Sequence, residues 1–483
     1  MRRLRGQDAA FWYGETASWH MHVGAVCTVD TSAAPDFSFD RVRELLIERI
    51  HLIPQFRWRA VETPLHIDRP VWVEDDEFDI DFHIRRVSVP SPGSDVELRN
   101  LTGQLMSYQL NRKRPLWEIW FIDGLHGDRV AMLLKTHHAI IDGVSGAGLA
   151  EILFDITPEP RHVEPGPPPD SAGPEVSGWE MFVRGVYHSL VGGPVRTTKL
   201  AITAARQGAA IPSQLRMPDR PPMPIVDSPR VLWSGDVTPH RSWAAVRVEL
   251  GRVKAVKNAA GVKINDVVLS LCAGAMRRHL VERDALPDRP LVVSVPVSLR
   301  TEHDASEVGS KVGNMFVAVA TNIEDPLERL NTIFANTKSA KEIQQASSAR
   351  SLIGITEAMP PAFIGLAARA ASSWGLGLGI GATPINAVVS NVPGPAIPLY
   401  VAGGLMESMI PLGPLLLGVG LNITVFSYLG SMDFGLQTCP ELIPEIDELA
   451  AAIPAELTAL EQALGLTARR RTPSRRKKSA ATA

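Results

Sequence analysis

The sequence predicts an α/β protein made of two related sandwich halves joined by a connector. The chain has 483 residues, more than one hydrophobic core usually serves, so about two domains are expected. Strand-like and helix-like apolar patterns alternate irregularly through both halves of the chain. Between the halves, residues 158–174 and 212–229 are dense in proline, which is typical of a linker.

These patterns divide the chain into four parts. Residues 1–157 form the N-terminal half and residues 230–465 the C-terminal half. Residues 158–229 form the connector, which carries helices of its own because residues 179–210 are basic and helical in pattern. That helical part either packs against the two halves or lies on a membrane. Residues 466–483 form a basic tail without apolar periodicity, which we expect to be disordered.

The first half combines two amphipathic helices with several strands. Apolar residues recur at helical spacing in residues 39–50 and 98–110. Short apolar runs predict strands at residues 23–29, 121–122 and 130–134. We expect the last two strands to pair around the turn between them.

The second half repeats this mixture. Helices are predicted at residues 251–260, 267–280 and 440–464, and strands at residues 242–250, 291–297, 387–391, 416–426 and 432–437. Residues 410–429 are the most apolar stretch, but proline and glycine interrupt it. A membrane-spanning helix needs about 20 mostly apolar residues, so we expect a buried pair of strands there.

The most informative motif lies at residues 137–143, where two histidines follow a strand and an aspartate-glycine turn comes next. A histidine at a strand end can be reached by a substrate, and its side chain accepts and returns a proton near neutral pH. We predict that His138 abstracts a proton from a hydroxyl while that hydroxyl attacks an acyl group. His137, Asp142 and Gly143 complete this candidate site.

Other interpretations of these residues exist. A histidine at a strand end is often structural, and Asp142-Gly143 alone is typical of a turn or a helix N-cap. Adjacent histidines in a strand point to opposite faces, so they rarely bind one metal ion together. No further ligand set of zinc-site spacing lies nearby, and no metal is expected.

Composition limits the partners and the compartment. Hydrophobic residues make up 45% and charged residues 21%, as in a globular protein, and the formal net charge is −3. The last 18 residues hold seven basic residues and no acidic ones, so the remaining body is acidic and nucleic-acid binding is not expected. The tail either keeps the chain soluble or attracts anionic lipid headgroups, at about 1 kcal/mol per basic residue.

Targeting signals are also not expected. The three cysteines are far apart and odd in number, which argues against a disulfide framework and favours a reducing cytoplasm. The N-terminus lacks the apolar segment of a secretory signal. Any membrane contact would be peripheral.

Several motifs, in this order, make the chain resemble the bacterial wax ester synthase/acyl-CoA:diacylglycerol acyltransferase family over nearly its whole length. They are Glu15-Thr16, residues 21–24, residues 114–118 with a proline-leucine-tryptophan motif, the dihistidine motif, residues 265–269 with an asparagine-aspartate motif, and residues 390–395. The dihistidine motif is also found in chloramphenicol acetyltransferases and peptide synthetase condensation domains. Ser270-Leu271-Cys272 departs from the smaller residues expected there, and the basic tail lies outside the pattern.

The resemblance implies two chloramphenicol-acetyltransferase-like domains with an active-site tunnel between them. It implies transfer of a fatty acyl group from acyl-CoA, a substrate and not a cofactor, to diacylglycerol or a long-chain alcohol. The second histidine of the motif, His138, would be the general base, and Asp142 would be structural. A peripheral place at a membrane or lipid droplet suits such substrates. Two alternatives stay open: a free-standing condensation-type acyltransferase, and a non-catalytic lipid-surface protein.

Other residues are assigned supporting roles. Asn265 is a candidate oxyanion donor, or it only caps a helix together with Asp266. Arg57 is a candidate partner for Asp142. Pro115, Leu116 and Trp117 are expected in the core or the cleft wall, and residues 375–380 and 412–421 either line an acyl tunnel or pack in the core. No Gly-x-Ser-x-Gly nucleophile motif is present, so we expect direct transfer without an acyl-enzyme.

Overall fold

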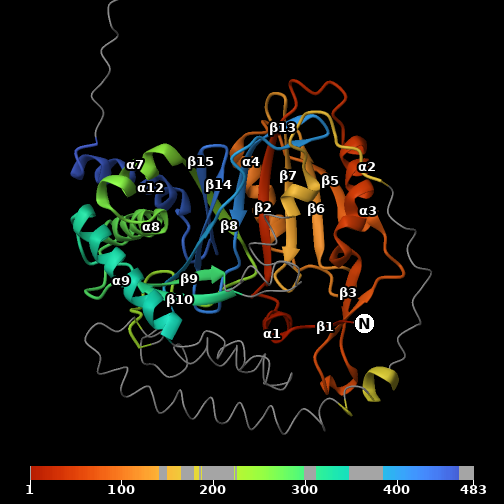
Figure 1. The fold of residues 1–483 in the computed structure, drawn as a ribbon, viewed down its shortest axis with the longest axis horizontal. Coiled ribbons are helices and arrows are strands. Elements are labelled where there is room, and N and C mark those ends of the chain that lie inside the picture. The colour runs from red at the N-terminus through yellow and green to blue at the C-terminus, as the bar shows by residue number, and fades with distance from the viewer. Residues whose placement is uncertain are drawn as a thin grey trace, which may run out of the picture.

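The computed structural model describes residues 2–140, 149–164, 179–183, 186–187, 222, 226–298, 312–346 and 385–466. Within them the chain forms two six-stranded sheets and one three-stranded sheet. Figure 1 shows the large sheets beside each other, with the N-terminal half in red to orange and the C-terminal half in green to blue. The expected α/β class with two sandwich-like halves is confirmed. Most of the predicted connector and nearly all of the basic tail lie outside the described residues.

The N-terminal half is built around a mixed sheet with the strand order β12-β13-β2-β7-β6-β5, and a small sheet has the order β1-β4-β3. Two strands of the mixed sheet, β12 (Tyr400–Val401) and β13 (Gly404–Leu412), come from late in the chain. The other elements of this half are β1 (Arg2–Arg3), α1 (Gly6–Gly14), β2 (His22–Asp30), α2 (Phe39–Arg49), η1 (Ile50–Leu52), η2 (Pro54–Arg57), β3 (Trp58–Val61), η3 (Pro64–His66), β4 (Val71–Glu74), α3 (Ile80–His83), β5 (Ile84–Ser88), α4 (Asp95–Met106), β6 (Trp117–Asp123) and β7 (Arg129–His137).

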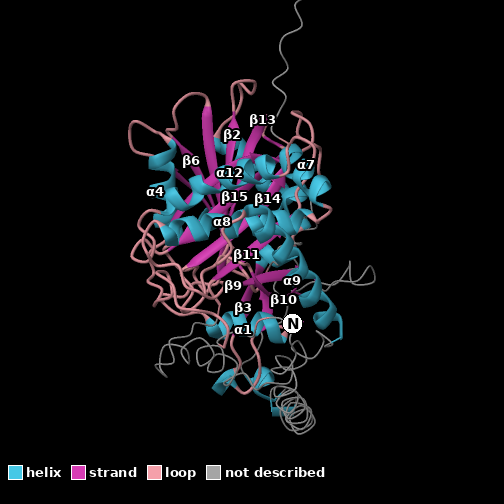
Figure 2. Ribbon diagram, turned by 90° about the vertical axis from the view of Figure 1, so that its left-hand side faces the viewer, coloured by secondary structure: helices cyan, strands magenta, loops and turns pink. Residues whose placement is uncertain are grey.

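The C-terminal half has the strand order β10-β9-β11-β14-β15-β8. Its elements are β8 (Ser242–Glu249), α7 (Leu250–Ala260), α8 (Ile264–Val281), β9 (Val292–Ser298), β10 (Val312–Ala318), α9 (Pro326–Ala346), β11 (Ala387–Val392), β12 (Tyr400–Val401), β13 (Gly404–Leu412), β14 (Leu421–Tyr428), β15 (Ser431–Thr438) and α12 (Ile446–Ala463). Figure 2 shows α7, α8, α9 and α12 in front of the strands. A large apolar cluster fills the space between these helices and the sheet.

Most predicted elements are confirmed, with small shifts at their ends. The predicted strands at 121–122 and 130–134 are β6 and β7, which pair antiparallel. Helix α4 begins at Asp95, earlier than expected, because Ser94 and Glu97 form a capping box there. All three cysteines are buried and free.

One segment of the C-terminal half joins the other sheet. Strand β13 pairs antiparallel with β2, with Met409 opposite Cys27. The two buried strands predicted within residues 410–429 are the end of β13 and all of β14, but they lie in different sheets and do not pair with each other. The chain leaves the N-terminal sheet after Leu412 and re-enters the C-terminal sheet at Leu421.

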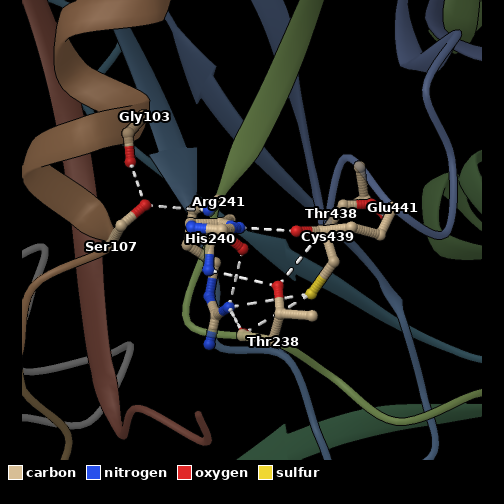
Figure 3. A network of polar contacts seen from close by, with 8 residues as sticks. All are labelled: Gly103, Ser107, Thr238, His240, Arg241, Thr438, Cys439 and Glu441. Atoms are coloured by element: carbon tan, nitrogen blue, oxygen red, sulfur yellow. Dashed lines mark hydrogen bonds and ion pairs between the residues drawn. The ribbon is translucent and has the colours of Figure 1, made fainter. Parts of the chain in front are cut away.

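Helix α4 connects the two halves. Thr102 Oγ1 accepts a hydrogen bond of 2.9 Å from Trp243 Nε1, and Ser107 Oγ accepts one of 2.9 Å from the backbone of Arg241. Figure 3 shows the Arg241 guanidinium turned toward Thr238 and Cys439. Apolar residues of α4, β2 and β7 pack with Trp243 in one buried cluster. The two halves therefore meet through a continuous apolar core.

No single helix among the described residues is long and apolar enough to be a candidate membrane span. Helices α7 and α8 meet that test only when taken together, and they are bent by 104° at their break.

Candidate active site

The two predicted histidines lie at the end of β7, and backbone hydrogen bonds fix both. His137 lies opposite His22 in the pairing of β7 with β2. The His137 N–H donates to the Leu116 carbonyl at 2.9 Å, and the His138 N–H donates to the Met21 carbonyl at 2.8 Å. His137 is fully buried, whereas His138 is half-buried. The pair therefore has one internal imidazole and one that is partly accessible.

The tautomer of His137 follows from its contacts. Its Nδ1 accepts a hydrogen bond of 3.1 Å from the Ala139 backbone N–H, so in the neutral ring the proton is on Nε2. That Nε2 lies 3.7 Å from Oε2 of Glu15, longer than a hydrogen bond, so the attraction is electrostatic. The Trp12 ring packs edge-on against His137, at 6.4 Å between centroids.

Glu15 is a buried carboxylate with several donors around it. Its Oε1 accepts from the Met21 N–H at 3.0 Å, and its Oε2 accepts from Arg112 Nε at 3.1 Å. Burial alone would raise the pKa of Glu15, but the His137 imidazole, the Met21 N–H and the Arg112 guanidinium lower it to about 2. The carboxylate is therefore ionised at neutral pH.

Helix α1 covers the histidine pair. The Phe11 ring packs on the His138 ring with 4.4 Å between centroids and a tilt of 37°. The backbone N–H of Glu15 caps the helix by donating to the Phe11 carbonyl. Because residues four apart share one face of a helix, Phe11 and Glu15 approach the pair together. No role was predicted for Phe11, Glu15 or Arg112 from the sequence, although the four-residue spacing of Phe11 and Glu15 was a usable signal.

The proline-leucine-tryptophan residues are buried beside the pair. The Leu116 carbonyl accepts the His137 N–H, and the Pro115 carbonyl accepts the Trp117 N–H at 2.9 Å. Trp117 Nε1 donates to the Phe56 carbonyl at 2.7 Å, and its ring stacks on His83 at 4.5 Å. These residues hold the start of β6 against the end of β7.

The asparagine-aspartate residues lie in the first turn of α8. Asp266 is buried and accepts hydrogen bonds from the Lys263 N–H at 2.9 Å and the Thr337 hydroxyl at 2.7 Å. It caps α8, with Lys263 in the N-cap position, and ties that helix to α9. Asn265 is half-buried, and among the described residues no hydrogen bond joins it to the histidines. Its oxyanion role stays a prediction.

The remaining candidates lie further away or outside the described residues. Asp142 and Gly143 fall outside them, as do residues 375–380. The Arg57 guanidinium lies 3.2 Å from Glu74. Because Asp142 lies outside the described residues, its predicted pairing with Arg57 stays a prediction. Within residues 412–421, the Leu415 carbonyl accepts from Trp19 Nε1 at 2.9 Å in a buried cluster. Ser270-Leu271-Cys272 is fully buried in α8.

Comparisons with known proteins agree with this arrangement. Residues 4–268 match the family model described as the wax ester synthase/diacylglycerol acyltransferase catalytic domain, and residues 308–461 match the C-terminal domain of the same family. A putative diacylglycerol O-acyltransferase of Mycobacterium tuberculosis is 37% identical, over 95% of this chain and 90% of the relative. A probable diacylglycerol O-acyltransferase of the same species is 36% identical, over 96% of this chain and 100% of the relative.

Solved structures show the same fold. The wax ester synthase/diacylglycerol acyltransferase from Marinobacter aquaeolei matches with a TM-score of 0.70 and 27% identity, covering 96% of this chain and 100% of that one. The first condensation domain of the calcium-dependent antibiotic synthetase matches with a TM-score of 0.56 and 16% identity, covering 96% of each chain, which shows a likeness of fold alone. With the dihistidine pair at the end of β7 and family matches across both halves, the chain belongs to the wax ester synthase/diacylglycerol acyltransferase family of acyltransferase enzymes.

Proposed function

We propose that this enzyme transfers a fatty acyl group from acyl-CoA to the free hydroxyl of diacylglycerol, with long-chain alcohols as a second class of acceptor. The observation that carries the proposal is the half-buried His138 at the end of β7, with its backbone fixed by Met21 and its ring packed on Phe11. The names of the mycobacterial relatives support diacylglycerol as an acceptor, and that of the Marinobacter protein supports both acceptors.

His138 is the proposed general base. A neutral imidazole within hydrogen-bond reach accepts the hydroxyl proton as the new carbon–oxygen bond forms, which typically contributes a factor of about 10²–10⁴. The carbon–sulfur bond of the thioester then breaks, and the departing thiolate takes the proton from the same imidazolium. One side chain serves both half-steps, so transfer is direct, and acyl-CoA is consumed as a substrate.

The other candidates have supporting roles in this proposal. His137 is buried with both ring nitrogens facing protein groups, so it positions its neighbour. Asp142 and Gly143 lie outside the described residues; Asp142 is assigned a structural role, with Arg57 as its candidate partner. Asn265 supplies a side-chain N–H to the oxyanion of the tetrahedral intermediate, since such donors are often the largest catalytic contribution.

An acceptor assay tests the proposal. Purified enzyme with palmitoyl-CoA should form triacylglycerol from diacylglycerol and wax ester from hexadecanol, and should form little amide from hexadecylamine. His138→Ala should lower the rate by about 10²–10⁴-fold. His240→Gln is the matched control, because that histidine is exposed and pairs with Glu441. Failure of both alcohols, or preferential amide formation, would contradict the function; a nearly wild-type rate for His138→Ala would contradict the base.

We also propose that the enzyme works at a membrane or lipid-droplet surface. Trp179, Val183 and Tyr187 are exposed and recur every four residues in the helical part of the connector. Aromatic side chains with one polar end suit a lipid–water boundary. The basic residues after position 466 would add attraction to anionic headgroups.

Flotation with lipid vesicles tests whether the exposed residues Trp179, Val183 and Tyr187 contact a membrane. Trp179→Ser/Tyr187→Ser should weaken binding to vesicles of phosphatidylcholine, phosphatidylglycerol and diacylglycerol, whereas Tyr108→Ser, at an equally exposed tyrosine elsewhere, should not. Removing residues 467–483 should weaken binding only when phosphatidylglycerol is present. Unchanged flotation of the double variant would reject this surface.

A further inference from the structure

We infer that Glu15 is the positioning residue of the dihistidine pair, holding both His137 and His138 in place, with Arg112 fixing its carboxylate. The inference rests on the proposed role of His138 as the base. Glu15 touches no group that reacts in that proposal, so it acts through the histidines.

The two carboxylate oxygens reach the pair by separate routes. Oε2 lies 3.7 Å from Nε2 of His137, the nitrogen that carries the proton when Nδ1 accepts from Ala139. Oε1 accepts the Met21 N–H, and the Met21 carbonyl accepts the His138 N–H. One side chain therefore orients the first imidazole directly and the backbone of the second through Met21.

Arg112 also holds the carboxylate of Glu15. Its Nε and Nη2 lie 3.1 and 3.0 Å from Oε2 of Glu15, and Nη2 also donates to the Trp12 carbonyl. The guanidinium lies over the Trp12 ring, 4.4 Å from the centroid, and that ring packs against His137. Arg112 therefore belongs to the same assembly and fixes the rotamer of Glu15.

The charged groups around Glu15 predict how removal of its negative charge would affect His138, the proposed base. Besides Arg112 and His137, the groups that interact with the carboxylate are His20, before β2, and Lys135, on β7. Glu15 is the acidic group among these basic ones. Glu15→Gln removes that negative charge and leaves the basic groups beside His138, so protonation of the proposed base should become less favourable.

Kinetics of Glu15→Gln test the inference. The amide keeps the size of the side chain but loses its charge. We expect kcat to fall about 10- to 100-fold with the KM for palmitoyl-CoA within twofold, because misplacement of about 1 Å can cost that much. The acid limb of the kcat/KM profile should move to lower pH. Arg112→Met should lower kcat in the same way, and Arg112→Lys should recover part of the loss.

Asp433→Asn is the matched control. Asp433 is an equally buried carboxylate held by Arg247 at 2.6 and 3.0 Å, but in the C-terminal sheet. The Asp433→Asn variant should be less stable than wild type, while its kcat and the acid limb of its kcat/KM profile stay unchanged. If Glu15→Gln behaved like Asp433→Asn, Glu15 would be merely structural and the inference would be overturned.

A measurement without substrate separates this inference from the proposed function. Imidazole ¹⁵N NMR of the histidine-labelled full chain, assigned with His137→Gln, should show His137 as the Nε2–H tautomer. Glu15→Gln should change that signal, and Asp433→Asn should not. An unchanged His137 signal in Glu15→Gln would overturn the inference even if diacylglycerol were acylated, and a changed signal would support it even if both alcohols failed.

Discussion

Arg241 Nη2 donates a hydrogen bond of 2.9 Å to the Ser18 carbonyl, joining the segment before β8 to the loop before β2. The same guanidinium donates to the carbonyls of Thr238 and His240, and it lies 3.7 Å from the Cys439 sulfur (Figure 3). Burial lowers the pKa of Arg241, because the charged guanidinium is less favourable inside the protein than in water. The contact links the C-terminal half to the loop that ends at Met21, beside the histidines.

Removing the Arg241 side chain should destabilise the contact between the halves. Arg241→Met leaves buried carbonyls without their charged donor, so the apparent free energy of unfolding should fall by about 2–4 kcal/mol in urea titrations. Arg278→Met is the control, since Arg278 is exposed and its pair with Glu282 is worth well under about 1 kcal/mol. Equal effects of the two variants would show that the buried network contributes no more than a surface pair.

The buried pair of Arg49 and Asp155 gives a second stability test. Arg49 Nη2 lies 2.9 and 2.7 Å from the two carboxylate oxygens, and both side chains are almost fully buried. Asp155→Asn leaves a buried guanidinium without its counter-charge and should cost about 3–5 kcal/mol. The double variant Arg49→Met/Asp155→Asn should lose less free energy of unfolding than the sum of the losses in the two single variants. Strict additivity in urea unfolding would mean that the two side chains are not coupled.

Local patterns predicted the elements, but they did not predict which distant segments meet. Strand β7 was predictable because an apolar run ends at the histidines. The place of β13 was not, because apolar residues such as Ile410 suit either sheet and the register with β2 is a long-range property. In α8, Asp266 is the capping residue and Asn265 is not, a distinction that depends on helix phase.

Only the part of the candidate site that is contiguous in the sequence could be predicted. The dihistidine pair is contiguous, so its position at a strand end follows from the sequence alone. Glu15 was noted only as part of the Glu15-Thr16 motif, and its partner Arg112 is 97 residues away in the sequence. Burial of that ion pair beside His137 is visible only in the folded chain.

Glu15 should also make stability depend on pH. Its pKa is about 2 in the folded chain and about 4.5 when unfolded, so folding favours the ionised form. The contribution, about 3 kcal/mol at most, is complete above about pH 4.5 and is lost as pH falls toward 2. Urea titrations from pH 7 to pH 3 should therefore show the gap between wild type and Glu15→Gln narrowing in acid. A gap of constant size would contradict this linkage.

The close approach of α4 to the segment before β8 depends on Gly103. A Cβ there would lie 2.7 Å from the Arg241 carbonyl oxygen, a backbone atom that cannot easily move aside. Gly103→Ala should therefore lower the free energy of unfolding by about 1–3 kcal/mol in urea titrations, despite the better helix propensity of alanine. Gly24→Ala is a matched control, since its Cβ would also meet an atom at 2.7 Å, but that atom is the Met106 sulfur at the end of a flexible side chain. Gly24→Ala should therefore cost less than Gly103→Ala. The reverse order would mean that the halves can separate at α4 more easily than Met106 can change rotamer.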